Sequence, residues 1–264
     1  MQLPELKTLL VSLQHGVLTV ILNRPESRNA MSLNMVEELS QLFRQLTCES
    51  SVRAIVIRGA GGHFCAGGDI KDMANARASG IDAYRDLNRA FGSMLEHAQQ
   101  LPQVVIAVLE GAVLGGGFGL ACISDIAIAI DDAKFGLPET TLGILPAQIA
   151  PFVAKRIGLT QARRLALTAA RFNGQEAARL GLVHFSEAST VALEQRLDET
   201  LVQIKRCAPQ ANAATKALLL NTELQPLEQL LDQAAQAFAE AVVSEEGVEG
   251  TLAFVQKRAP GWAL

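Results

Sequence analysis

The sequence has few cysteines and no excess of positive charge. Its four cysteines, Cys48, Cys65, Cys122 and Cys207, form no CxxC pair. This spacing favours reduced, mostly buried thiols over a disulfide framework or a zinc site. The 23 basic residues are outnumbered by 27 acidic ones, which gives a formal net charge of −4. No general positive field attracts a polyanion, so nucleic acid is not expected as a partner.

Long apolar runs are also missing. The longest strongly apolar stretch without charge, 111–124, is broken by Gly115, Gly116 and Gly117. It is shorter than the ~20 residues that a membrane-spanning helix needs. The first ten residues, MQLPELKTLL, lack the basic and apolar regions of a secretory signal. We therefore expect no membrane partner and a cytoplasmic location.

What the sequence does contain is enough apolar residues for a core. Of its 264 residues, 49% are hydrophobic and 19% are charged, as in a globular chain. Hydrophobic periodicity predicts a hairpin over 9–22, helices over 33–47 and 81–100, and short strands at 54–57, 104–108 and 126–130. Beyond Ile157 strand signals nearly vanish and helical spacing takes over. The pattern indicates an α/β fold with βα units followed by a helical part.

Two glycine-rich loops each follow a predicted strand. They cover Gly59–Asp69 and Gly111–Gly119, and neither has the GxGxxG or P-loop pattern of a nucleotide site. A single such cluster is more typical of turns and close helix packing. Two of them can also bring backbone N–H groups close to a ligand, as in an oxyanion hole for a carbonyl that gains negative charge.

The third notable segment is Phe135–Ile144, in which Pro138 fixes the backbone just before Glu139. The neighbours Leu137, Leu142 and Ile144 are apolar, so desolvation should raise the pKa of the Glu139 carboxyl. A raised pKa suits a general acid or base near neutral pH. Taken alone, however, Glu139 is more typical of a helix-capping or ion-paired acid.

Together these motifs resemble the enoyl-CoA hydratase/isomerase (crotonase) superfamily. The resemblance rests on Phe64–Asp69, Gly111–Ala121 and Phe135–Pro146, in this order and spacing, and it covers essentially the whole chain. It implies the α/β crotonase fold, with a repeated ββα spiral core over 1–195 and a helical trimerisation region over 196–264. It also implies an acyl-CoA thioester substrate and a homotrimer or homohexamer.

The resemblance further implies roles for individual residues. The thioester carbonyl would lie between the N–H groups of Gly68 and Gly116, with Glu139 as the catalytic carboxylate. Coenzyme A is then part of the substrate, so no separate cofactor and no metal are expected. Its adenine and phosphates would contact a set of residues to which a neighbouring subunit contributes the last two: Arg28, Ala66, Gly67, Ile70, Phe254 and Lys257.

One position departs from the pattern of two-acid hydratases in this superfamily. They carry a glutamate two residues after the GGG run, where this chain has Gly119. We interpret Gly119 as leaving the site open for a substrate that is bulky at C3 or brings its own carboxylate. The segment 143–152 resembles bacterial hydratases of isohexenylglutaconyl-CoA, the first candidate substrate, and of 3-methylglutaconyl-CoA, the second. A Δ3-Δ2 enoyl-CoA isomerase, which needs one acid, and a non-catalytic acyl-CoA-binding homologue are the alternatives.

The remaining polar residues near these loops are given structural roles. Asp69 and Asp125 fit local caps or turns better than catalysis. Cys65 has no base nearby in the sequence and is interpreted as a small apolar filler. The four histidines are scattered without metal-ligand spacing.

Overall fold

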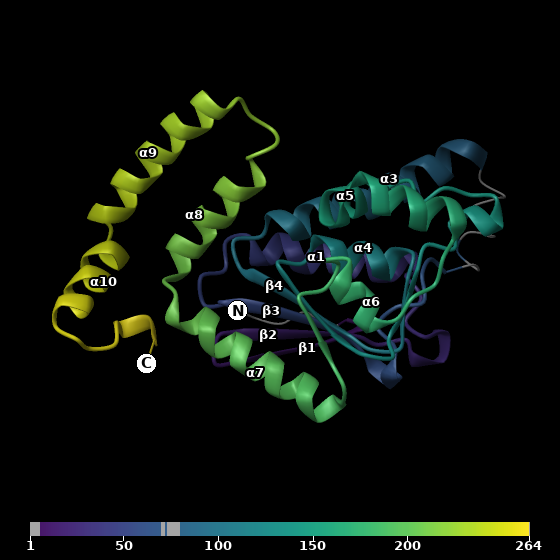
Figure 1. Ribbon diagram of the computed structural model, residues 1–264, viewed down its shortest axis with the longest axis horizontal. Coiled ribbons are helices and arrows are strands. Elements are labelled where there is room, and N and C mark those ends of the chain that lie inside the picture. Colours follow the sequence, from purple (N-terminus) through teal and green to yellow (C-terminus); the bar gives the residue numbers. More distant parts are fainter. Residues whose placement is uncertain (1–5, 70–71, 73–79, 264) are drawn as a thin grey trace.

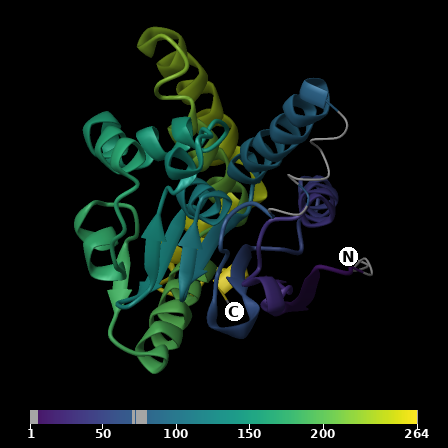
Figure 2. The same cartoon turned by 90° about the vertical axis from the view of Figure 1, so that its right-hand side faces the viewer.

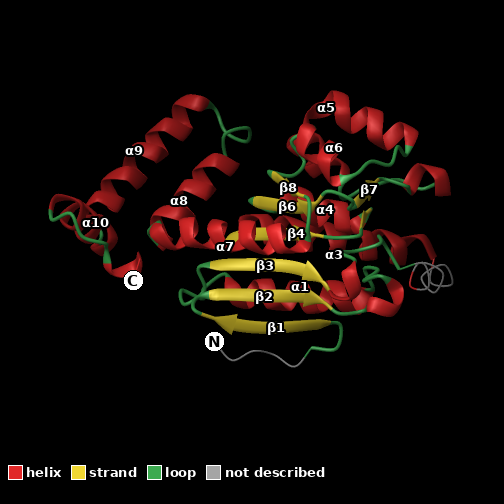
Figure 3. Cartoon of the chain, turned by 60° about the horizontal axis from the view of Figure 1, so that its bottom comes forward, coloured by secondary structure: helices red, strands yellow, loops and turns green. Residues whose placement is uncertain are grey.

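The computed structural model describes residues 6–69, 72 and 80–263 and shows a mixed α/β fold (Figure 1). Six strands form the main sheet in the order β1-β2-β3-β4-β6-β8, which can be followed in Figure 3. Only β1 and β2 are antiparallel; each later neighbour is parallel. The strands are β1 (Leu9–Gln14), β2 (Val17–Leu22), β3 (Ala54–Gly59), β4 (Val104–Leu109), β6 (Ile126–Ile130) and β8 (Phe185–Glu187).

A second, smaller layer of extended segments runs beside this sheet. It contains the parallel pair β5 (Ala112–Leu114) and β7 (Lys134–Gly136). Isolated bridges join Met31 to Gly68 and Cys65 to Val113 in the same parallel sense. Each turn of the chain thus gives a strand to the main sheet, a short segment to the second layer and then a helix. This confirms the expected repeat of ββα units, and it places both glycine loops in the second layer.

Helices cover both faces of the main sheet because its central strands are apolar on both sides. On β3, Ile55 and Ile57 pack into the larger core cluster, whereas Ala54 and Val56 pack toward α7 (Thr190–Arg206), green at the bottom of Figure 2. The other face carries α1 (Leu33–Leu46), α3 (Gly80–Gln100), α4 (Gly116–Ile123), α5 (Ala150–Thr168) and α6 (Gly174–Arg179). Both predicted helices, at 33–47 and 81–100, are confirmed.

The last three helices extend away from the sheet (Figure 1). They are α8 (Pro209–Leu220), α9 (Leu227–Val243) and α10 (Glu245–Val255). The division predicted at 195/196 falls inside α7, where Leu193, Leu197 and Ile204 all pack on the sheet. α7 therefore packs on the sheet on both sides of that division. In the part of the chain described, no helix combines the length and apolar character needed to cross a membrane.

Three short strands, β5, β7 and β8, were not predicted from the sequence. β8 has only three residues, FSE, and pairs with β6 along one edge. A single apolar residue gives no period to detect, so the strand depends on its neighbour rather than on its own pattern.

A buried asparagine fixes the first glycine loop. Asn29 has a positive φ of 57° and is fully buried. Its side-chain N–H groups donate to the carbonyl oxygens of Ala60 (2.9 Å) and His63 (2.6 Å). Its Oδ1 accepts from the backbone N–H of Arg24 (2.8 Å). Arg24 also forms an ion pair with Asp69 (2.8 Å), so both ends of the loop are tied to the segment before α1.

Candidate active site

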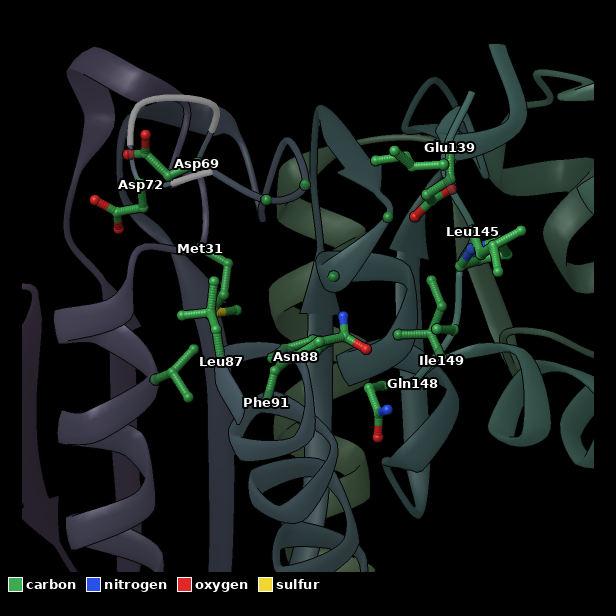
Figure 4. Close-up of a pocket in the computed structure, with 18 of the residues that line it drawn as sticks. Met31, Asp69, Asp72, Leu87, Asn88, Phe91, Glu139, Leu145, Gln148 and Ile149 are labelled. Atoms are coloured by element: carbon green, nitrogen blue, oxygen red, sulfur yellow. The ribbon is translucent and has the colours of Figure 1, made fainter. Parts of the chain in front are cut away.

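A pocket of about 240 Å³ opens where the two glycine loops meet the segment that follows β7. Figure 4 shows Met31, Asp69 and Asp72 on one side, Glu139 and Ile149 on the other, and Asn88 between them. The sequence-predicted residues that line it are Ala66, Gly67, Gly68, Gly116 and Glu139. The structure therefore brings both predicted loops and the predicted acid to one cavity.

Two backbone N–H groups at this pocket are available to a ligand. Among the described residues, neither the Gly68 nor the Gly116 N–H donates to another group of the protein. Gly116 is the first residue of α4, where the helix leaves its N–H groups unpaired and carries partial positive charge. Next to it, a Cβ at Gly117 would lie 2.7 Å from Cys65 Cβ, so only glycine lets the two loops approach this closely.

Glu139 lies beside the start of α4. It follows Pro138 and begins a short 3-10 turn, η3 (Glu139–Leu142). Gly115 has a φ of 47°, and a Cβ there would lie 2.9 Å from Glu139 Oε1. Glycine at 115 therefore serves both the backbone conformation and the close approach of the carboxylate.

The Glu139 carboxyl forms no ion pair with the described residues. Its Oε2 is buried without a hydrogen bond, and no cation of the described residues pairs with it. Burial raises the pKa of the Glu139 carboxyl above its ordinary value, and a hydrogen bond from its own backbone opposes the rise. The ion-paired alternative is thus wrong. An unpaired carboxyl with a raised pKa is instead suited to accept and return a proton.

The raised pKa predicts that Glu139→Gln stabilises the fold at neutral pH. Above about pH 4.5, the ordinary value, the folded wild type holds the Glu139 proton more tightly than the unfolded chain. The wild type therefore loses stability relative to the variant as pH rises from there, until the raised pKa is passed. Urea unfolding of both proteins from pH 4 to pH 8 measures this. A Glu139→Gln difference that stays flat over this pH range contradicts the assignment.

The expectation that Gly119 leaves the site open is wrong. Gly119 is buried, and a Cβ there would overlap Cγ2 of Ile149 and lie 3.3 Å from Leu95 Cδ1. Ile149 itself is only 2% exposed. An apolar side chain from just before α5 thus fills the space beside the position where a second acid was expected.

The other predicted coenzyme A contacts are spread over the chain. Arg28 is exposed, and its carbonyl accepts from the Ala66 N–H (3.0 Å) at the edge of the pocket. Ile70 lies outside the described residues. Phe254, which is 86% exposed, lies in the last turn of α10, and Lys257 follows the helix; neither lines this pocket. Their contact with coenzyme A from a neighbouring subunit stays a prediction.

Several pocket residues were not assigned from the sequence. They include Asn88 and Phe91 on α3 and Gln148 and Ile149 before α5. A signal existed in Gly92, a glycine inside a helix, because such a position often marks a close approach. A Cβ at Gly92 would overlap the Gln148 side chain.

The residues given structural roles do have local partners. Asp125 accepts from the Val105 N–H and from Lys216 Nζ, each at 2.7 Å. Cys65 is buried, and desolvation raises the pKa of its thiol to about 11, which suits an inert filler. His63 Nδ1 accepts from the Ala112 N–H at 3.1 Å and so joins the two loops.

Comparison with known proteins gives consistent matches. A model of the enoyl-CoA hydratase/isomerase family matches residues 12–263. The solved structure of Pseudomonas aeruginosa AtuE is 70% identical, covers 98% of this chain and 100% of that one, and has a TM-score of 0.97. An enoyl-CoA hydratase/isomerase from Marinobacter aquaeolei is 55% identical over 97% of this chain and 99% of its own, with a TM-score of 0.95. The 2,3-dehydroadipyl-CoA hydratase of Escherichia coli is 32% identical and covers 96% of this chain and 97% of its own.

Proposed function

Since this chain belongs to the enoyl-CoA hydratase/isomerase family, we propose that it hydrates a branched 2-enoyl-CoA that carries its own carboxylate, with isohexenylglutaconyl-CoA as the first candidate. The chain is an enzyme of the enoyl-CoA hydratase type. The observation that carries the proposed chemistry is the unpaired, buried Glu139 carboxyl beside the glycine-lined pocket.

The proposed mechanism uses two kinds of group. The Gly68 and Gly116 N–H groups would hold the thioester oxygen and stabilise the enolate that forms when water adds at C3. One oxyanion-hole donor is worth roughly 3 kcal/mol in comparable enzymes. Glu139 would position the water and exchange protons with it. The product is a 3-hydroxyacyl-CoA.

The acyl part of the pocket supports a large, partly apolar substrate. Leu87, Phe91, Leu142 and Leu145 line it, and Leu145 is 75% exposed. A bulky apolar branch would cover these side chains, which the smaller 3-methyl group of 3-methylglutaconyl-CoA would leave partly exposed. The name of the Escherichia coli relative refers to 2,3-dehydroadipyl-CoA, which also carries a carboxylate on its acyl chain.

The second candidate is a Δ3-Δ2 enoyl-CoA isomerase. It is favoured by one observation: Ile149 stands where a second acid was expected, and a single carboxylate suffices for a proton shuttle. A non-catalytic acyl-CoA binder is not favoured, because such a protein has no use for an unpaired acid beside the acyl chain.

A panel of purified thioesters tests the proposal. It contains isohexenylglutaconyl-CoA, 3-methylglutaconyl-CoA, crotonyl-CoA and a linear 3-enoyl-CoA, with products identified by mass spectrometry. We expect hydration with the highest kcat/KM on the isohexenyl substrate. Conversion of the 3-enoyl-CoA to its 2-enoyl isomer, with no hydrated product from any thioester, would establish the isomerase instead.

Arg28 is proposed to contact the phosphates of coenzyme A, and its charge reversal gives a separate prediction. Arg28→Glu replaces attraction by repulsion at an exposed site, so KM should rise by about 5-fold at low ionic strength and by less at high salt. Steady-state kinetics at two salt concentrations measure this. Arg44→Glu makes the same charge change at an exposed position on α1 and should leave KM unchanged. Equal KM values for Arg28→Glu and wild type at low salt would remove Arg28 from the site.

We further propose a homotrimer or homohexamer in the cytoplasm that needs no separate cofactor. Apolar side chains on the outer helices support the assembly: Leu231 and Phe238 on α9 and Leu252 on α10 are all exposed within one chain. An adjoining subunit would cover such a surface and could bring Phe254 and Lys257 to a neighbouring pocket.

A further inference from the structure

The carboxyl and amide side chains that line the pocket form two groups. Asp69 is paired with Arg24, and Asp72 accepts from the Leu33 N–H (2.7 Å). With Glu139 they make three carboxyl groups, whereas no lysine, arginine or histidine of the described residues lines the cavity. The second group is a pair of neutral amides, Asn88 and Gln148.

Both amides neighbour Gly92 of α3. Asn88 and Gly92 are four residues apart on α3 and so share a face of the helix. Gln148 lies directly against Gly92, since a Cβ there would overlap Gln148 Oε1 and lie 3.1 Å from its Cγ. Figure 4 shows Asn88 and Gln148 below the three acids, with Asp69 and Asp72 on one side and Glu139 on the other.

Both amides are available to a ligand. Neither side chain takes part in a hydrogen bond with any described residue. Their immediate neighbours in the pocket, Phe91 and Ile149, are apolar and offer no acceptor. The amide N–H groups are therefore the free side-chain donors at this end of the cavity.

We propose that Asn88 and Gln148 form the subsite that binds the carboxylate of the substrate. This inference rests on the proposed function, because it requires an acyl chain that carries a carboxylate. Neutral N–H donors can bind that carboxylate without pairing with Glu139, as a lysine or arginine in the pocket would. The position also keeps the substrate charge apart from the three protein acids, with which it would repel.

The test changes donors into acceptors with little change in shape. Asn88→Asp and Gln148→Glu should each raise KM for 3-methylglutaconyl-CoA and isohexenylglutaconyl-CoA by about 10-fold or more, because a carboxylate would then face a carboxylate. Crotonyl-CoA lacks that group, so its KM and kcat should stay within about 2-fold of wild type. Gln100→Glu adds the same charge at the far end of α3, about 18 Å along the helix. It should leave KM and kcat unchanged for both kinds of substrate.

The outcomes separate this inference from the proposed function. Equal losses on the carboxylated and the uncarboxylated substrates would overturn the inference, since the amides would then act on the attacking water or on the fold. If the wild type hydrates 3-methylglutaconyl-CoA and both variants do so with the wild-type KM, the inference is overturned and the proposed function stands. A wild type that hydrates crotonyl-CoA but no carboxylated thioester would overturn both. Asn88→Leu removes donors without adding charge. It should also raise KM for the carboxylated substrates and not for crotonyl-CoA, but by less than Asn88→Asp.

Discussion

Glu139→Gln is expected to lower kcat by about 10²-fold or more on every thioester that the wild type hydrates. Glutamine keeps the shape of the side chain but cannot take a proton from water or return it. The substitution leaves the Gly68 and Gly116 N–H groups and the side chains that line the acyl part of the pocket unchanged, so KM should change little. Steady-state kinetics of the purified variant measure both constants.

The control for this result is Glu37→Gln, the same chemical change at an exposed position of α1 outside the pocket. It should behave as wild type. Full activity of Glu139→Gln would show that the proton is handled by another group. A rise in KM with unchanged kcat would also contradict the assignment, because it would make Glu139 a binding residue only.

Gly119→Glu is expected to lower both the stability of the fold and the rate of hydration. The new side chain would overlap Ile149 and crowd Leu95 in a closely packed region. Overpacking of a core costs about 1–3 kcal/mol, and an unpaired buried carboxylate adds to that cost. We therefore expect a lower melting temperature and reduced hydration of all substrates. Thermal unfolding and the thioester panel measure both effects.

A double variant shows whether Ile149 is the cause. Ile149→Ala removes the Cγ2 atom that Gly119→Glu would meet, so the double variant should be more stable than Gly119→Glu alone. With room for the new acid, crotonyl-CoA hydration should recover more than hydration of a carboxylated substrate, which the added charge repels. Ile149→Ala alone is the control for the lost packing. A Gly119→Glu protein with the melting temperature of the wild type would contradict the packing seen around Gly119.

The chemistry of the site could be predicted further from the sequence than its shape. Both glycine loops follow directly after predicted strands, and parallel strands bring such segments to one edge of a sheet. Glu139 is assigned to the same site through the family resemblance. Gly119 shows that an acid is missing. It does not show which side chain takes the space, because Ile149 comes from 30 residues further along the chain. Likewise α7 reads as helical, but its contact with the sheet depends on packing that periodicity does not specify.

The bridges of the second layer, Met31 to Gly68 and Cys65 to Val113, have an evolutionary consequence. They position the proposed oxyanion donors through backbone groups, which every amino acid except proline possesses. The acyl part of the pocket, in contrast, is lined by side chains on α3 and before α5, and each can be replaced by a single codon change. Descendants of this gene can therefore acquire new acyl preferences while they keep the same backbone donors for the thioester oxygen.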